Sequence, residues 1–309
     1  MPHPKTQPLS IACIGEAMIE LSDNDAPDTA TLRFAGDTLN AAIYLRRNLS
    51  PEHKVSFVTV LGRDGFSDRM IDFIASERIE TAGIARHADR LPGIYAISVD
   101  GAGERTFAYW RNQSAARTLF DAESGPALDA LARFDVVYLS GITLAILPDA
   151  VRGALLDWIA VYRAQGGRFA FDSNYRPRLW ASADEARHWI GRAWAACDIA
   201  LPSVDDEMAL FGDADSAAVL ARFAGYAPAV GALKCGADGP VALSACDRLP
   251  KFRAADRVVD TTAAGDSFVG AFLASHLCGA SLGAAMLAGH EQAVRVIGHR
   301  GAILPRAGA

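Results

Sequence analysis

Residues 258–274, VVDTTAAGDSFVGAFLA, place one acidic residue, Asp266, where a row of small residues passes into an apolar helical pattern. The backbone amides of Ala263, Ala264, Gly265 and Asp266 fall in the first turn of this expected helix. First-turn amides have no acceptor within the helix and carry the positive end of its dipole, so they can hold a phosphate. A carboxylate beside them can take a proton from a hydroxyl group during phosphoryl transfer. Asp266 is therefore a candidate general base, and the alternative is an acid that only complements the dipole.

A second pair of polar side chains stands at the start of another expected helix, in the stretch FAGDTLNAAIYLRRN. Gly36 and Asp37 come directly before the helical pattern, and Asn40 falls in its first turn. An aspartate that caps the helix explains Asp37 on composition alone. The residues by themselves therefore indicate a helix start with two polar groups beside it.

Two arginines are expected to approach one crevice. Tyr109 and Arg111 lie two apart at the end of a strand and so share a face, and Tyr95 lies on the strand before it. Arg176 follows a strand that ends at Asp172, at the carboxyl edge where open α/β sheets bind ligands. Two converging arginines suit a carboxylate, which accepts paired charge-assisted hydrogen bonds. The alternative for each arginine is a solvated surface charge.

Two further stretches carry weaker patterns. Lys234, Gly236 and Gly239 have the spacing K-x-G-x-x-G between two expected strands, which a glycine-rich hairpin turn also explains. The stretch LPSVDDEMALFG begins a helix with acidic residues, an ordinary complement to the helix dipole. The dipeptide Gly-Lys of a Walker A loop never occurs, and GDSFV lacks the final glycine of a nucleophile elbow.

The elements that must position these residues alternate along the chain. Short apolar runs such as VSFVTVLG, FDVVYLSG and RFAFD end in Gly or Asp, and most are followed by helical patterns. This alternation predicts an α/β fold with a mainly parallel sheet covered by helices on both faces. LPGIYAISVDGAGERTFAYW instead predicts a β-hairpin. We expect a single domain over residues 1–309, with a small β-sheet lid formed by about residues 17–35 and 92–111.

Composition limits the partners and the compartment. The chain has 309 residues, 51% hydrophobic and 21% charged, and its formal net charge of −6 argues against a nucleic-acid partner. The apolar run near the N-terminus is interrupted by Glu16 and Glu20, so we expect neither a signal peptide nor a membrane span. Five scattered cysteines without metal-binding spacing indicate reduced thiols in the cytoplasm (Cys13, Cys197, Cys235, Cys246 and Cys278).

The stretch DTTAAGDSF, residues 260–268, resembles the C-terminal motif of the ribokinase family of sugar kinases, usually Asp-Thr-x-Gly-Ala-Gly-Asp-x-Phe. Ala263 stands where most members have glycine. The resemblance covers nearly the whole chain and implies a ribokinase-like three-layer α/β/α fold with a β lid. It also implies that Asp266 is the catalytic base, with the preceding amides as an anion hole. GDTLNAA and SNYRPRLWAS look like the branch that phosphorylates 2-keto-3-deoxygluconate.

The same resemblance implies where each substrate lies. Gly36, Asp37 and Asn40 match the stretch that contacts the sugar, and Tyr95, Tyr109, Arg111 and Arg176 match segments that hold a keto acid. ATP is the implied phosphoryl donor, with eight residues as its implied contacts: Asn174, Ser203, Lys234, Gly236, Asp238, Gly239, Ala288 and Gln292. Mg²⁺ is the implied cofactor, held through waters by Asp206 or Glu207. Potassium, required in part of the family, is left open as a further cofactor.

The expected function is therefore the phosphorylation of the terminal hydroxyl of 2-keto-3-deoxygluconate by ATP. One alternative is a kinase of the same family that acts on a neutral sugar, and another is a sugar-sensing protein without turnover. The expected partners are a small sugar acid and ATP, and a homo-oligomer through the exposed lid edge is a further expectation. Gluconate-derived and galactonate-derived keto acids differ at one hydroxyl, which the sequence does not resolve.

Overall fold

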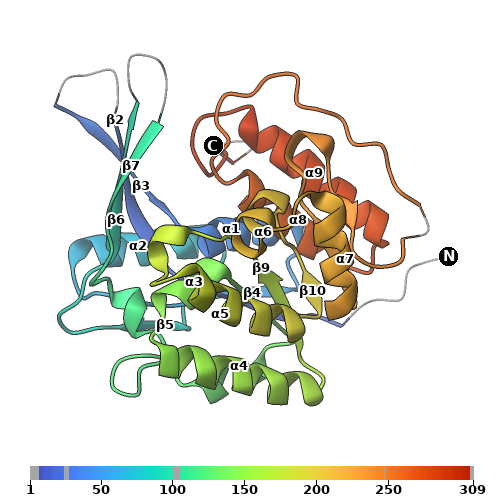
Figure 1. Ribbon diagram of the computed structural model, residues 1–309. Coiled ribbons are helices and arrows are strands. Elements are labelled where there is room, and N and C mark those ends of the chain that lie inside the picture. The colour runs from blue at the N-terminus through green and yellow to red at the C-terminus, as the bar shows by residue number, and fades with distance from the viewer. Residues whose placement is uncertain (1–6, 24–27, 100–104, 247, 307–309) are drawn as a thin grey trace.

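An eight-stranded sheet forms the centre of the computed structural model, which describes residues 7–23, 28–99, 105–246 and 248–306 (Figure 1). The strand order is β12-β11-β10-β9-β8-β1-β4-β5, and neighbours run parallel except for β11 and β12. The strands are β1 (Ser10–Ile14), β4 (Lys54–Leu61), β5 (Ile84–Arg86), β8 (Val136–Ser140), β9 (Arg168–Asp172), β10 (Ile199–Ala200), β11 (Val230–Leu233) and β12 (Val241–Ala242). Parallel strands point their carboxyl ends to one edge, where the polar residues that follow them come together.

Helices cover both faces of this sheet because its side chains alternate between two apolar layers. In β1, Ile11 and Cys13 join the core on one face, and Ala12 and Ile14 join the core on the other. The first face is covered by α1 (Asp37–Asn48), α2 (Gly65–Ser76), α8 (Ala264–Leu277) and α9 (Leu282–Ile297). The second is covered by α3 (Gly141–Ile146), α4 (Asp149–Ala164), α5 (Ala183–Ala195), α6 (Val204–Phe211) and α7 (Ser216–Tyr226). The expected three-layer α/β/α fold is confirmed.

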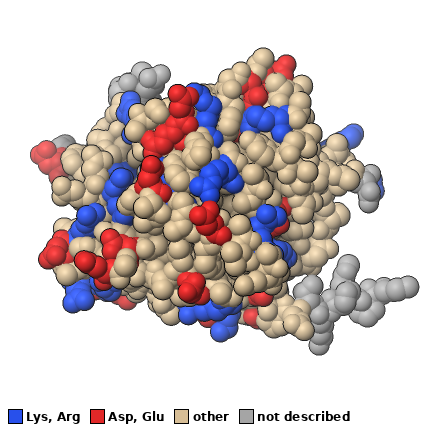
Figure 2. Space-filling model, turned by 60° about the horizontal axis from the view of Figure 1, so that its bottom comes forward, with Lys and Arg blue, Asp and Glu red and all other residues tan. Residues whose placement is uncertain are grey.

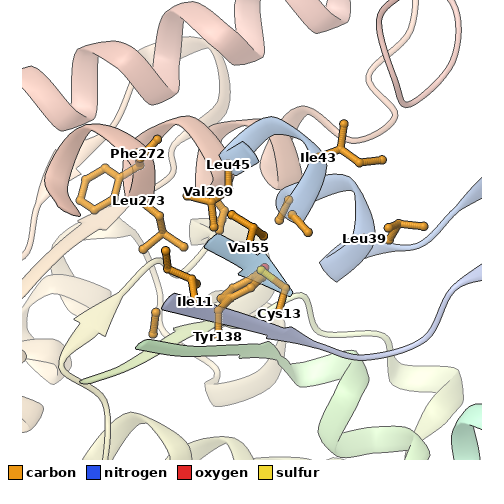
Figure 3. Close-up of a cluster of buried hydrophobic side chains, with 14 of the residues drawn as sticks. Ile11, Cys13, Leu39, Ile43, Leu45, Val55, Tyr138, Val269, Phe272 and Leu273 are labelled. Carbon is orange, nitrogen blue, oxygen red and sulfur yellow. The ribbon is translucent and has the colours of Figure 1, made fainter. Parts of the chain in front are cut away.

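The apolar pattern that follows Asp266 forms a core helix. Val269, Phe272 and Leu273 of α8 are fully buried, and Figure 3 shows them beside α1 and above Ile11 of the sheet. Because these side chains pack against both α1 and the sheet, the start of α8 is held at a fixed position relative to the start of α1. The packing therefore fixes where Asp266 can lie.

A second sheet of four strands projects from the main body (Figure 1). Its order is β3 (Ala30–Ala35), β2 (Met18–Asp23), β6 (Gly93–Val99) and β7 (Arg105–Trp110). The β2–β6 pair is parallel, and the other two pairs are antiparallel. This second sheet confirms the small β-sheet expected beside the main one. We call it the lid.

Charged side chains of both signs are interspersed over the face of the molecule shown in Figure 2. This mixture agrees with a net charge of only −6 over 309 residues. Within the described part of the chain, no helix is both long and apolar enough to cross a membrane.

Candidate active site

Polar side chains meet at the carboxyl edge of the main sheet. Ser140 ends β8, and its hydroxyl donates a hydrogen bond to Asp37 at the start of α1. The same carboxylate oxygen accepts a hydrogen bond from Asn174 Nδ2 at 3.0 Å. Asn174, predicted to contact ATP, therefore lies beside Asp37, which is predicted to contact the sugar. Its φ of 31° is left-handed, which asparagine tolerates better than most residues.

Asp266 lies in the first turn of α8, beside the first turn of α1. Its Oδ2 accepts a hydrogen bond of 2.9 Å from Asn40 Nδ2, and its side chain is half-buried. Burial raises the pKa of Asp266 to about 7, the nearby charge of Asp37 adds to the rise, and the Asn40 hydrogen bond opposes it. A carboxylate with a pKa near neutrality can both accept and release a proton at physiological pH. The geometry therefore suits a general base.

The charge of Asp37 gives Asp266 a testable pH dependence. If Asp266 must be ionised, kcat falls as the pH drops below about 7. Asp37→Asn removes a negative neighbour, so the pKa of Asp266 should fall and the acid limb of the kcat profile should move to lower pH. The control is Asp68→Asn, an exposed acid on α2, which should leave the limb in place. If the acid limb of the kcat profile does not move in Asp37→Asn, the charge of Asp37 does not raise the pKa of Asp266.

The turn before α8 determines which backbone amides are available to bind an anion. The Ala264 amide donates to the Thr261 carbonyl at 3.2 Å, so it is engaged within the turn, and its place in the anion hole stays a prediction. Within the residues that the structure describes, the amides of Gly265 and Asp266 have no such acceptor. Ala263, the N-cap, has φ 60° and ψ 15°, the left-handed conformation that usually selects glycine. The motif's usual glycine is thus replaced at a position where alanine is strained.

Relieving that strain should stabilise the protein. Left-handed backbone costs alanine about 1–2 kcal/mol, and glycine gives back about 0.5–1 kcal/mol through its more flexible unfolded chain. Ala263→Gly should therefore raise the free energy of unfolding by about 0.5–1 kcal/mol, measured by urea denaturation. Ala264→Gly lies within the helix and should lower it by about 0.5–1 kcal/mol. Equal decreases in the free energy of unfolding of both variants would show that Ala263 is not strained.

Lys234 connects the glycine-rich turn to the same edge of the sheet. Its Nζ lies 2.7 Å from Asp172 Oδ1, and a Cβ added at Gly265 would lie 3.5 Å from Nζ. A cation therefore stands directly beside the start of α8. Gly236 and Gly239 have φ of 54° and 82°, so both positions of the predicted turn use left-handed backbone. Asp238 between them is exposed, and Ser203 forms a parallel bridge with Lys234.

The lid presents tyrosines toward the main body in two different ways. Tyr95 is buried, and its hydroxyl donates to the buried carboxylate of Glu20. Tyr109 is 49% exposed and stacks on Tyr95, with ring centroids 5.8 Å apart. Only Tyr109 of this pair therefore offers a solvent-accessible ring.

The two predicted carboxylate-binding arginines occupy different surroundings. Arg111, which follows β7, is 6% exposed and forms an ion pair with Glu16. Its Nε is buried without a hydrogen-bond partner among the described residues. The Arg176 side chain is about half exposed, and its Nη1 lies 3.6 Å from Asp206 Oδ1. Each guanidinium is thus held by an acid, and Arg111 is the more firmly placed.

The two candidate metal acids point to different sides of α6. Asp206 accepts a hydrogen bond of 3.1 Å from the Tyr175 amide, and burial raises its pKa. Glu207 is fully buried between Trp194 Nε1 at 3.2 Å and Arg222 Nη2 at 2.9 Å. Glu207 is therefore paired inside the fold, which leaves Asp206 as the better placed of the two candidate metal acids. The described residues contain no group of three or more His, Cys, Asp or Glu that could hold a metal by themselves.

Ala288 and Gln292, two of the residues predicted to contact ATP, both lie on α9. Ala288 is half-buried. Gln292 Oε1 accepts hydrogen bonds from Arg295 at 3.1 Å and from Asn48 at 3.5 Å, at the far end of α1. Since Asp37 and Asn40 mark the near end of α1, Gln292 lies away from these two residues, and its contact with ATP stays a prediction.

The buried polar residues that were not predicted for the site include Glu16, Glu20, Ser140, Asp172 and Asp260. Asp260 accepts hydrogen bonds from the amides of Thr262 at 2.9 Å and Gly301 at 2.7 Å, so it holds the loop before α8 in place. The sequence signal for Glu16 and Glu20 was present, because acids that interrupt an apolar strand must find partners when buried.

The sequence and the fold of this chain match known proteins. Residues 8–307 match the model of the pfkB family of carbohydrate kinases. The 2-dehydro-3-deoxygluconokinases of Escherichia coli (strain K12) and Dickeya dadantii are 43% and 44% identical over 306 residues, covering 96% of this chain and 97% of each relative. The crystal structure of 2-dehydro-3-deoxygluconokinase from Thermotoga maritima is similar with a TM-score of 0.80 and 20% identity, covering 96% of this chain and 95% of that one. At that identity, the structural likeness concerns the fold.

Proposed function

Because the chain belongs to the pfkB family of carbohydrate kinases, we propose that it is a 2-keto-3-deoxygluconate kinase. The reaction transfers the γ-phosphoryl group of ATP to the terminal hydroxyl and yields 2-keto-3-deoxy-6-phosphogluconate. The observation that carries the proposal is Asp266 beside unpaired amides at the start of α8, within a chain that matches two such enzymes over nearly its full length. The main body and the lid together form the one catalytic unit.

Asp266 takes the proton of the attacking hydroxyl in the proposed mechanism. Its elevated pKa makes it a better proton acceptor than an ordinary surface aspartate. The amides of Gly265 and Asp266, with the Lys234 ammonium beside them, stabilise the negative charge that spreads over the transferring phosphoryl group. Asn40 fixes the orientation of the base through its 2.9 Å hydrogen bond.

The sugar acid lies between this base and the lid. Asp37 accepts hydrogen bonds from sugar hydroxyls, and Gly36 lets the chain pass close to Glu16, because a Cβ there would lie 2.1 Å from the Glu16 carbonyl oxygen. Arg111 binds the carboxylate, supported by Tyr95, Tyr109 and Arg176. This arrangement directs the terminal hydroxyl toward Asp266 and the nucleotide.

ATP binds along the edge that carries Lys234 and the left-handed glycines Gly236 and Gly239, with Ser203, Asp238 and Ala288 nearby. Mg²⁺ keeps most of its waters in such sites and is held largely by the phosphates, so the lack of a protein metal cage in the described residues fits it. Asp206 and Asp172 are the carboxylates that would orient those waters. Mg²⁺ supplies charge neutralisation on the phosphates.

We place the enzyme in the cytoplasm, where its free cysteines stay reduced. We also propose a homo-oligomer through the outer strand of the lid. Within the described residues, β7 borders that sheet and exposes Phe107, Tyr109 and Trp110 by 39%, 49% and 62%. An exposed apolar edge strand favours pairing with a second copy.

A substrate panel tests the function. ADP release is measured with 2-keto-3-deoxygluconate, 2-keto-3-deoxygalactonate, fructose and ribose, with and without potassium. We expect the keto acids to exceed the neutral sugars in kcat/KM by at least about 100-fold, since the paired arginine contacts are lost with a neutral sugar. Higher kcat/KM with fructose or ribose would contradict the proposal, and no turnover with any sugar would favour a non-catalytic sugar-binding protein.

A further inference from the structure

A concave surface rich in arginine lies at the opposite edge of the main sheet from the candidate active site. It has a volume of about 780 Å³. Lys54 begins β4 and is in register with Ser10 at the start of β1. The concave surface therefore lies at the edge where these parallel strands begin. We call it the basic depression and define it by six lining residues: Arg46, Arg47, Lys54, Arg78, Arg295 and Arg306.

The basic depression has a strong excess of positive charge. Its six cationic side chains face two carboxylates, Glu77 and Glu80, which leaves four formal positive charges in excess among the lining residues. The whole chain, by contrast, has a net charge of −6. Like charges gathered in a concavity repel one another and concentrate a positive potential there.

The two carboxylates are already engaged. Glu77 binds Arg47 through two hydrogen bonds of 3.0 and 2.8 Å and binds Arg306 at 3.0 Å. Glu80 Oε1 lies 3.3 Å from Lys54 Nζ. In the described residues, no carboxylate lies within ion-pair distance of the three remaining arginines, which are Arg46, Arg78 and Arg295.

Arg46 shows the effect of this imbalance. It is 9% exposed and donates to the carbonyls of Leu49 and Ser50, each at 2.7 Å, at the end of α1. Burial lowers its pKa, and the charge of Arg78 lowers it further. The charge of Arg78 therefore disfavours the charged form of Arg46, and the nearby charge of Glu52 opposes this effect.

The backbone of Arg78 is an independent sign of function. Arg78 follows Glu77, the C-cap of α2, and has a left-handed φ of 60°. Glycine is the usual residue at this position because it carries no strain there. An arginine that keeps a strained backbone while its guanidinium has no acidic partner in the described chain points to an external ligand.

We propose that the basic depression binds a small molecule that carries at least two phosphoryl groups. Arginine forks match phosphate oxygens in geometry, and an excess of four positive charges matches a diphosphate. Leu49, Pro51, Leu304 and Pro305 add apolar surface for an organic frame, and the volume is in the usual range for small-molecule sites. This site is separate from the proposed ATP site at the carboxyl edge and does not depend on the proposed function.

Isothermal titration calorimetry with inorganic pyrophosphate tests the proposal. The Arg78→Ala/Arg295→Ala variant should bind pyrophosphate at least tenfold more weakly than the wild type at this site. The matched control Arg133→Ala/Arg192→Ala removes the same charge from positions outside the depression and should keep the wild-type affinity. Any binding of pyrophosphate at the nucleotide site is common to all three proteins, so the difference between them reports the depression.

A second variant separates loss of binding from loss of folding. Arg78→Gly removes one charge and relieves the left-handed backbone, so it should be folded, at least as stable as the wild type, and weaker in binding by several-fold. Identical isotherms for the wild type and the Arg78→Ala/Arg295→Ala variant would overturn the proposal. Citrate that binds as tightly as pyrophosphate at equal ionic strength would also overturn it, because a phosphate site discriminates by oxygen geometry.

Discussion

Asp266→Asn is expected to lower kcat by about 10³-fold, because a positioned general base contributes roughly 10²–10⁴ to rate. Asparagine keeps the shape of the side chain and can still accept the hydrogen bond from Asn40. ATP and the sugar acid should therefore bind with affinities close to those of the wild type, measured by calorimetry. Turnover within tenfold of the wild type would refute the assignment of Asp266 as the base.

The same variant has a stability signature that a misfolded protein would lack. The pKa of Asp266 is raised from 3.8 to about 7 in the folded state, so folding favours the protonated carboxyl. This contribution is present at low pH and is lost as the pH rises through about 7. Relative to the wild type, Asp266→Asn should therefore be more stable at pH 8 than at pH 5, as judged by urea denaturation. An equal difference in the free energy of unfolding between the variant and the wild type at both pH values would contradict the raised pKa of Asp266.

Arg111→Met is expected to raise the KM for 2-keto-3-deoxygluconate by about 100-fold or more, while the KM for ATP stays nearly constant. Each hydrogen bond to a charged group contributes roughly 1.5–3 kcal/mol, and a carboxylate loses two of them. The substitution also leaves Glu16 buried without its cation, which destabilises the fold by about 3–5 kcal/mol. A lower stability alone could therefore imitate a binding defect.

The Glu16→Gln/Arg111→Met variant distinguishes these effects. Removing both charges of the buried pair should restore most of the lost stability. The KM for the sugar acid should stay high, because no guanidinium is present to bind the carboxylate. Recovery of the wild-type KM in this variant would show that Arg111 acts only as the partner of Glu16.

Most of the fold could be predicted because its signals are local. The alternation of apolar runs and helical patterns indicated the parallel sheet, and the two alternating runs that became β6 and β7 indicated the lid. The position of Asp266 also followed from a local pattern. Small residues before an apolar helix mark a helix start whose backbone a ligand can approach closely. These features depend on neighbours in the sequence.

Local patterns do not determine side-chain direction, which depends on distant residues. Asp206 and Glu207 are adjacent on α6, so they point about 100° apart around the helix. Only the positions of Trp194 and Arg222, supplied by α5 and α7, decide which acid is buried. The direction of Gln292 depends in the same way on Asn48, which comes from a helix that begins 255 residues earlier in the chain.

All four lid strands join the main body along one line. The register pairs Met18 with both Ala35 and Gly93, and Ile94 with Trp110, so these strand ends lie side by side. Glu16 and Arg111 flank the same line, and a Cβ at Gly93 would approach both, at 2.7 Å from Glu16 Oε1 and 3.0 Å from Arg111 Cβ.

The lid face next to this line is packed as well, because Ile19 and Phe34 belong to the core of the main body and the Phe34 ring lies 5.8 Å from the Phe73 ring of α2. The base of the lid, with Arg111 beside it, is therefore held in place. We expect any movement of the lid to be largest at its free margin, so that the substrate's acidic end stays fixed.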